Sequence, residues 1–337
     1  MINNDFNGRL ESISMLRIIC AFGVAISHMP ILKDVGIHFS AGVEIFFCIT
    51  GFLTLYTTSK KKPEHFLIKK FSRLLPLYWL LTIMTFVAMF IIPSMKMEGV
   101  GIIEVLKSMF FIPVVRNSLQ DGMVIRPIVG PAWSLYFDIY FLVIFYICMQ
   151  ISYEYRGLIA LAVTSILFIC SLCFQPENAF LVVLFRYRWI FFITGMLCYY
   201  LLRKVWDCPI LQSRITRAVL LVIGIVTLAF YYVDAFKYTY LAVAVIFCCF
   251  VLAFRKSAIP HCLCVLADIS FSFYLIHYFV ILALDMVIPL DANNVLSLVG
   301  ILLVFLISIV CAKISFVWIE NKFGNLILSK VLRKNIS

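Results

Sequence analysis

The amino-acid sequence predicts an all-α polytopic membrane protein with about ten transmembrane helices. Hydrophobic residues make up 64% of the 337 residues and charged residues only 13%, whereas a soluble domain carries roughly a quarter charged residues. The apolar residues also form runs of roughly 20 residues, the length that a helix needs to span a bilayer. These observations exclude an ordinary soluble enzyme or binding domain.

Ten apolar runs follow one another along the chain. The first contains Arg17, and no small-residue cleavage site follows it, so we expect a retained helix and not a cleaved signal peptide. We expect spans at residues 12–32, 40–58, 74–92, 130–150, 157–174, 180–202, 217–233, 238–254, 264–287 and 295–319. An even number of spans places both termini on one side of the membrane.

The distribution of lysine and arginine predicts which side that is. Most of the 28 lysine and arginine residues fall in the termini and in the connections on the same side. Cytoplasmic loops are enriched in these residues, so we expect both termini in the cytoplasm and the chain in the plasma membrane. The formal net charge of +11 then reflects inner loops and anionic lipid, and we expect no nucleic-acid partner.

The remaining features predict one membrane-embedded domain over residues 1–337, without an additional soluble domain. Most of the twelve cysteines lie in apolar runs, where a free cysteine behaves as a small hydrophobe. The Cys170-x-x-Cys173 pair and the cluster at His261, Cys262 and Cys264 both lack the second ligand pair of a zinc site, so we expect no metal. The connection 93–129 is the longest, and its role is left open.

Charged and titratable side chains inside the predicted spans are the candidates for function. Such a residue costs on the order of 3 kcal/mol at the bilayer centre and usually faces the interior of the helix bundle. Arg17 and His28 are eleven positions apart, which is about three turns and about 16 Å, so they share one helix face. The others are Glu44, Asp138, Arg186 and Arg188, which map with His28 to the external half, and His277, which lies near the middle of its span. Lys70 and Arg73 map with Arg17 to the cytoplasmic entrance.

Simpler alternatives exist for several of these residues. Arg17 can extend its charge to the inner headgroups, and His28 can be a hydrogen-bonded histidine at the outer interface. Arg186 and Arg188 are two positions apart and cannot share a helix face, so one of them can be an interfacial anchor. The clustering of these residues, and not any single one, favours a functional site.

Six short motifs occur in order along the chain. They are Arg17-x10-His28, Gly42–Leu53 with Glu44, Lys70–Trp79 with Arg73, Pro131–Asp138 with Trp133 and Ser134, Ser270–His277 with Tyr274, and Trp318–Asn321 with Glu320. This series resembles that of the integral-membrane acyltransferases of type 3, which acylate cell-envelope glycans. The departures are mostly conservative, such as Glu44 for the more usual Asp, Asp138 for Glu and Lys70 for Arg.

The resemblance implies transfer of an acyl group, usually acetyl, from cytoplasmic acyl-CoA (acetyl-CoA by default) to a hydroxyl of a cell-surface glycan or lipid-linked sugar. His28 would act as base or nucleophile, and Glu44 or Asp138 would orient it. Lys70 and Arg73, with Arg17 at the entrance, would bind the CoA phosphates. Candidates for substrate binding or for the oxyanion are Trp133, Ser134, Arg186, Arg188, Tyr274 and His277.

Two other functions stay open from the residues alone. Buried ionisable groups also suit a proton-coupled transporter or an exporter of a sugar or lipid-linked substrate, although the two halves of the chain lack matching Gly/Pro breaks. A sensor with a decayed site is less consistent with the retained Arg17, His28, Glu44 and Trp133. The acceptor, the acyl group, the oligomeric state and the choice between one-step transfer and an acyl-enzyme are left open.

Overall fold

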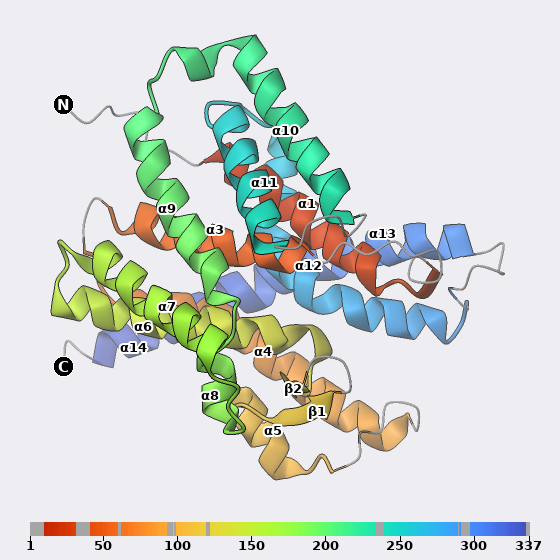
Figure 1. Cartoon of the computed structure of the whole chain (residues 1–337). Helices are drawn as coiled ribbons and strands as arrows, with labels where there is room; N and C mark the ends of the chain where they lie inside the picture. Colours follow the sequence, from red (N-terminus) through yellow and green to blue (C-terminus); the bar gives the residue numbers. More distant parts are fainter. Residues whose placement is uncertain are drawn as a thin grey trace. The chain divides into compact units, whose positions relative to one another are not determined.

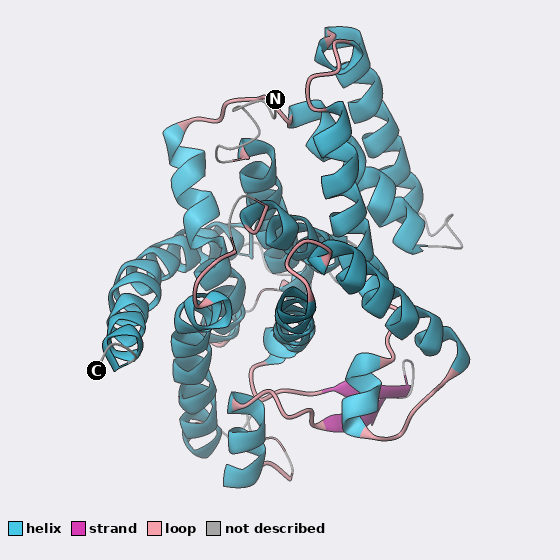
Figure 2. Ribbon diagram, turned by 90° about the vertical axis from the view of Figure 1, so that its left-hand side faces the viewer, coloured by secondary structure: helices cyan, strands magenta, loops and turns pink. Residues whose placement is uncertain are grey.

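The computed structural model describes residues 10–31, 41–59, 62–92, 97, 99–118, 122–232, 239–288, 290 and 297–334. Apart from one two-stranded hairpin, the regular structure of these residues is helical (Figures 1 and 2). The chain therefore has the all-α polytopic membrane fold that its composition predicts.

Eight helical segments of the described ranges are long and apolar enough to cross a membrane. They are Glu11–His28, Phe66–Ile91, Gly130–Ile151, Arg156–Cys173, Ala179–Val205, Arg214–Tyr232, His261–Asp285 and Ser297–Val331. Two shorter apolar helices, Ala41–Thr57 and Thr239–Phe254, lie at the second and eighth predicted spans. All ten predicted spans thus correspond to apolar helices, and the cytoplasmic position of the termini stays a prediction.

The contacts of the chain define two compact units, of which the first comprises Met1–Lys61 and Arg188–Ile309. Its helices are α1 (Glu11–His28), α3 (Ala41–Thr57), α9 (Trp189–Val205), α10 (Arg214–Tyr232), α11 (Thr239–Phe254), α12 (His261–Asp285) and the first part of α13 (Ser297–Ser315). Helix α1 packs against α12 and α3, α3 against α9, and α10 against α11 (Figure 1).

Two glycines permit the close crossing of α3 and α9. A Cβ atom on Gly195 of α9 would overlap the carbonyl oxygen of Cys48 on α3, and one on Gly51 would overlap the carbonyl oxygen of Phe192. Helices in a membrane gain little from the hydrophobic effect against each other, so small residues that allow backbones to approach are favoured at their interfaces. The α3–α9 pair uses glycine in this way on both helices.

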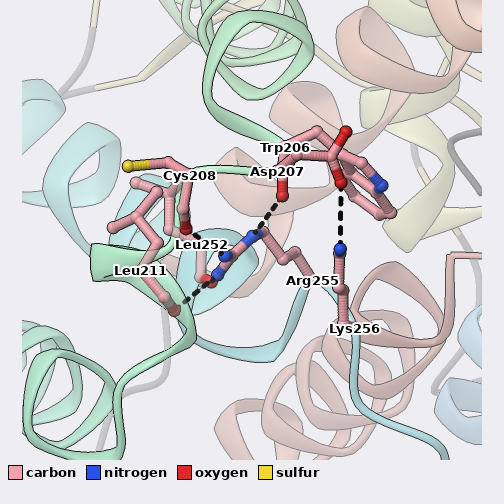
Figure 3. A network of polar contacts seen from close by, with 7 residues as sticks. All are labelled: Trp206, Asp207, Cys208, Leu211, Leu252, Arg255 and Lys256. Atoms are coloured by element: carbon pink, nitrogen blue, oxygen red, sulfur yellow. Dashed lines mark hydrogen bonds and ion pairs between the residues drawn. The ribbon is translucent and has the colours of Figure 1, made fainter. Parts of the chain in front are cut away.

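A buried arginine fastens the connection between α9 and α10 to the end of α11 (Figure 3). The Arg255 side chain is only 4% exposed, and its guanidinium donates hydrogen bonds to four backbone carbonyls. They are those of Leu211 at 2.7 Å, Trp206 at 3.1 Å, Leu252 at 3.2 Å and Cys208 at 3.4 Å. Beside it, Lys256 forms a 3.0 Å ion pair with Asp207. The carbonyl of Cys208 also accepts from the backbone N–H of Leu211 at 3.2 Å. Arg255 adds donors to carbonyls at the end of α11 and in the connection, where regular helical hydrogen bonds end.

The second unit comprises Lys62–Tyr187 and Val310–Ser337. It contains α4 (Phe66–Ile91), α5 (Ile102–Met109), β1 (Val115–Ser118), β2 (Gly122–Ile125), α6 (Trp133–Ile151), α7 (Arg156–Cys173), α8 (Ala179–Leu184), the end of α13, a π-helical stretch over Phe316–Phe323 and α14 (Gly324–Lys334). Helix α4 packs against α5, α6, the π-helical stretch and α14.

The connection 93–129 contains α5 and the antiparallel hairpin β1–β2 (Figure 2), a local exception to the predicted all-helical structure. The Tyr78 hydroxyl of α4 lies 3.0 Å from the carbonyl oxygen and 2.7 Å from the Oγ atom of Ser108. Because Tyr78 has one hydroxyl proton, it donates to the carbonyl and accepts from Ser108. Trp79 donates to the carbonyl of Met109 at 2.9 Å, so α5 is fastened to α4 by polar contacts.

Candidate functional site

Two histidines from distant parts of the sequence meet in the first unit. His28 is the last residue of α1 and His277 lies on α12. The Nε2 atom of His277 is 3.3 Å from the Nδ1 atom of His28, and their ring centroids are 5.2 Å apart. His277 is fully buried and His28 is half-buried. The packing of α1 against α12 therefore joins two residues that the sequence analysis named for different roles.

Each imidazole also contacts a backbone carbonyl of its own helix. The Nδ1 atom of His28 is 2.8 Å from the carbonyl oxygen of Val24, and the Nδ1 atom of His277 is 3.1 Å from that of Phe273. In both cases the carbonyl belongs to the residue four positions earlier, which the helix places beneath the ring. The backbone thus fixes the orientation of both rings.

Aromatic rings surround the histidine pair. The ring of Phe273 stacks on His277 with centroids 6.0 Å apart, and Tyr274 lies tilted at 6.0 Å. Tyr278 meets the ring of His28 edge-on at 5.7 Å. Such rings add packing that restricts side-chain rotation, so the imidazoles are held in a rigid and largely apolar setting. Tyr274, predicted as a substrate-binding residue, lies beside the pair.

Glu44 and Arg188 form a second polar feature of the same unit. Glu44 lies in the first turn of α3, and Arg188 directly precedes α9. Arg188 lies within electrostatic range of Glu44, and Glu44 lies within electrostatic range of Cys20 of α1. Cys20 precedes His28 by about two turns, or about 12 Å along α1. Glu44 therefore lies within electrostatic range of both the middle of α1 and Arg188.

The groups at the Nδ1 atom of His28 differ from those that we expected from the hydrolase triads. The family resemblance implies that Glu44 or Asp138 orients His28. In the structure, the carbonyl of Val24 and the ring of His277 contact this nitrogen. Asp138 belongs to the second unit. The catalytic roles of the two carboxylates stay predictions.

Arg17 and the two arginines of the sixth span have distinct local settings. Helix α1 is continuous through Arg17 and His28, as the predicted three-turn separation requires. The sixth span, predicted as one helix, is interrupted after Leu184 and resumes at Trp189. Arg186 and Arg188 lie in this interruption and not about two turns inside a continuous helix. Because the backbone is not helical at these two residues, the helical rule that residues two positions apart cannot share a face does not apply to Arg186 and Arg188.

In the second unit, Arg73 on α4 forms an ion pair with Glu320. The Nε atom of Arg73 donates to Oε2 of Glu320 at 2.9 Å, and the carboxylate side chain is fully buried while Arg73 is 45% exposed. The guanidinium also lies 5.6 Å from the centroid of the Phe316 ring. Lys70 is half-buried and one turn away on the same helix face. Glu320 belongs to the last of the six motifs, and its position in the sequence predicted no role for it.

The other predicted residues of this unit lie at the start of α6. A 3-10 turn at Gly130–Ala132 leads into this helix, and the Ser134 hydroxyl donates to the carbonyl of Pro131 at 3.4 Å. The ring of Trp133 meets Phe137 edge-on at 6.3 Å. The Oδ1 atom of Asp138 is buried one turn beyond Ser134. The first two turns of α6 thus contain Trp133, Ser134 and Asp138.

Within the described ranges, no group of three or more His, Cys, Asp or Glu side chains is arranged to hold a metal ion. The cysteines of these ranges are free thiols. The expectation that the two short cysteine motifs bind no metal stays a prediction.

The fold and the site define a class: a multi-pass membrane protein whose apolar helices enclose a histidine pair and charged residues. The family model described as an acyltransferase domain matches residues 10–314. The chain therefore belongs to this family of membrane acyltransferases, which confirms the resemblance found in the six motifs. Comparisons with curated proteins and with solved structures give no match.

Proposed function

We propose that the protein is a plasma-membrane O-acyltransferase that takes an acyl group, acetyl by default, from cytoplasmic acyl-CoA. The acceptor is a hydroxyl of a cell-surface glycan or of a lipid-linked sugar. The observation that carries this proposal is the contact between His28 and His277 inside the membrane-spanning helices of an acyltransferase-family protein. A half-buried imidazole at the end of a helix can exchange protons with a substrate while remaining fixed in position.

His28 acts as the general base in this proposal. It takes the proton of the acceptor hydroxyl as the hydroxyl oxygen attacks the thioester carbonyl. The tetrahedral intermediate then collapses: the carbon–sulfur bond breaks, the ester remains on the acceptor, and the proton on His28 passes to the departing CoA thiolate. If His28 is instead the nucleophile, its Nε2 atom attacks the thioester carbonyl, the carbon–sulfur bond breaks and CoA leaves as thiolate. The acceptor hydroxyl then attacks the acyl-imidazole and passes its proton to the thiolate, and the acyl–nitrogen bond breaks as the ester forms.

Cations of the two units have separate roles in donor binding. Arg73 and Lys70 bind phosphates of CoA, because the Arg73 guanidinium reaches solvent while its Nε atom is held by Glu320. Arginine suits phosphate because its donors form a planar fork. Arg17 binds a polar part of the donor from its position on α1.

Turnover with purified protein tests the proposal. The protein in nanodiscs is incubated with radiolabelled acetyl-CoA, with and without an envelope glycan fraction, and release of free thiol is followed. We expect release that rises with glycan and is lost in His28→Ala. The matched control is His261→Ala, since His261 is an exposed histidine at the first residue of α12. Label that stays on the protein without acceptor would identify an acyl-enzyme.

Folded protein that turns over neither acetyl-CoA nor other short acyl-CoA donors would contradict the proposal. In that case, uptake of labelled sugars or lipid-linked substrates in proteoliposomes with and without a proton gradient would test the transporter alternative.

A further inference from the structure

The contacts of the two histidines determine where their ring protons lie. A carbonyl oxygen only accepts hydrogen bonds, so the ring nitrogen that faces it must carry the hydrogen. The Nδ1 atoms of His28 and His277 face the carbonyls of Val24 and Phe273. In the neutral state both rings therefore carry hydrogen on Nδ1 and a lone pair on Nε2.

The contact between the rings agrees with this assignment. The Nε2 atom of His277, which carries a lone pair, faces the Nδ1–H group of His28 at 3.3 Å. That hydrogen is shared between two acceptors, the carbonyl of Val24 and the ring of His277. The opposite tautomer of His277 would place its hydrogen against the N–H group of His28 and leave the carbonyl of Phe273 facing a lone pair. One protonation pattern therefore satisfies all three contacts.

We propose that His277 is a positioning residue that holds His28 in the tautomer with hydrogen on Nδ1, so that Nε2 of His28 is the atom that takes the acceptor proton. The catalytic part of this inference rests on the proposed function, whereas the tautomer does not. His277 replaces the carboxylate that supports histidine in hydrolase triads. Because it is fully buried, water does not compete for its lone pair.

The same contacts also stabilise the protonated, positively charged form of His28. Once Nε2 has taken a proton, both ring nitrogens are donors, and Nδ1–H keeps its two acceptors. Hydrogen bonds from a charged donor are stronger than those from a neutral one, so the contact with His277 strengthens during proton transfer. A contact of this kind raises turnover more than it raises substrate affinity.

Two amide substitutions at position 277 separate the two contacts of this ring. The Oε1 atom of Gln can occupy the position of the imidazole Nε2 and accept from His28. The side chain of Asn is shorter and reaches only the position of Nδ1, beside the carbonyl of Phe273. His277→Gln therefore keeps the acceptor for His28, and His277→Asn removes it, while both variants place one amide in the same buried site.

The test measures tautomer and turnover together. The chain contains five histidines, so ¹⁵N-histidine labelling in nanodiscs allows His28 to be assigned by its absence in His28→Ala. We expect hydrogen on Nδ1 of His28 in the wild type and in His277→Gln, and a shift toward the Nε2–H form in His277→Asn. We also expect kcat to fall about tenfold or more in His277→Asn, the effect of one orienting hydrogen bond to a charged group, with the KM for acyl-CoA unchanged.

The control is Ile269→Ala, which removes a buried side chain from α12 about two turns before His277. It should lower the unfolding temperature without changing the tautomer of His28. Equal tautomer populations in His277→Gln and His277→Asn, or a wild-type His28 with hydrogen on Nε2, would overturn the inference. The expected tautomer shift in a protein without acyl-CoA turnover would uphold the contact and contradict the proposed function instead.

Discussion

Arg73 and Glu320 are joined by a 2.9 Å ion pair whose two ends have different access to water. The Glu320 side chain is fully buried, and that of Arg73 is 45% exposed. If the carboxylate is removed, the arginine can reach water, whereas removal of the arginine leaves a buried charge. A buried charge without its partner is strongly unfavourable. The pair is therefore asymmetric, and its two single substitutions should differ.

We expect Arg73→Gln to destabilise the protein by about 1–3 kcal/mol, below the figure for a fully buried pair because Arg73 is partly solvated. Glu320→Gln should cost less, and the double variant should recover part of the loss. Thermal unfolding in one detergent measures all three. Lys69→Gln, an exposed change on the same helix, is the control. Equal losses in the two single variants would argue against the asymmetry.

The same pair predicts an effect on the donor. Glu320 holds the Nε atom of Arg73, so Glu320→Gln should leave the guanidinium less well oriented toward phosphate. We expect the KM for acyl-CoA to rise by about threefold to tenfold, the range of a weakened charge-assisted hydrogen bond, with kcat little changed. Initial rates over a range of acyl-CoA concentrations measure both constants. A fall in kcat alone would place Glu320 outside donor binding.

Arg255→Lys should destabilise the first unit. A lysine ammonium has three donors on one atom and cannot reproduce the fork that reaches four carbonyls, so some buried carbonyls lose their partners. We expect a loss of about 1–3 kcal/mol, measured by thermal unfolding. Lys256→Ala, which removes the neighbouring exposed ion pair and the contact of the ammonium with the Trp206 ring, should cost about 0–1 kcal/mol. Similar losses in the two variants would contradict this role of Arg255.

Gly195→Ala should separate α3 from α9, because the added methyl group meets the backbone carbonyl of Cys48. Overpacking of this kind costs about 1–3 kcal/mol or more. Gly224 offers the matched control, since a Cβ atom there would lie 3.7 Å from the Cβ atom of Cys249, an ordinary contact. We expect Gly224→Ala to fold with little change in unfolding temperature. A well-tolerated Gly195→Ala would show that the helices can move apart freely.

Tyr78→Phe should loosen α5 from α4. It removes the hydroxyl that donates to the Ser108 carbonyl and accepts from the Ser108 Oγ atom. We expect the free energy of unfolding to fall by about 1–3 kcal/mol, because both buried groups of Ser108 lose this hydrogen-bond partner. Limited proteolysis should then cut the connection 93–129 faster than in the wild type. Tyr155→Phe, at an exposed tyrosine, should leave the cleavage rate unchanged.

Structural features that depend only on residues close together in the sequence, such as the membrane-spanning helices, could be predicted. The ten apolar runs coincide with helices because hydrophobicity over roughly 20 residues decides insertion locally. The interruption at Phe185–Arg188 escaped prediction, since this stretch contains neither glycine nor proline and apolar residues flank it on both sides. The hairpin β1–β2 escaped it because two strands of four residues give too short a pattern to distinguish from a loop.

The sequence by itself determined the class of the protein, the positions of its spans and, through six ordered motifs, its family. Only the tertiary structure decided which distant side chains meet. His28 and His277 are separated by 249 positions, and Arg73 and Glu320 by 247. The helical repeat of the sequence predicts which face of a helix a residue occupies. Which residues contact that face depends on how helices far apart in the chain pack together. The contact of His28 with a second histidine is a result of that packing.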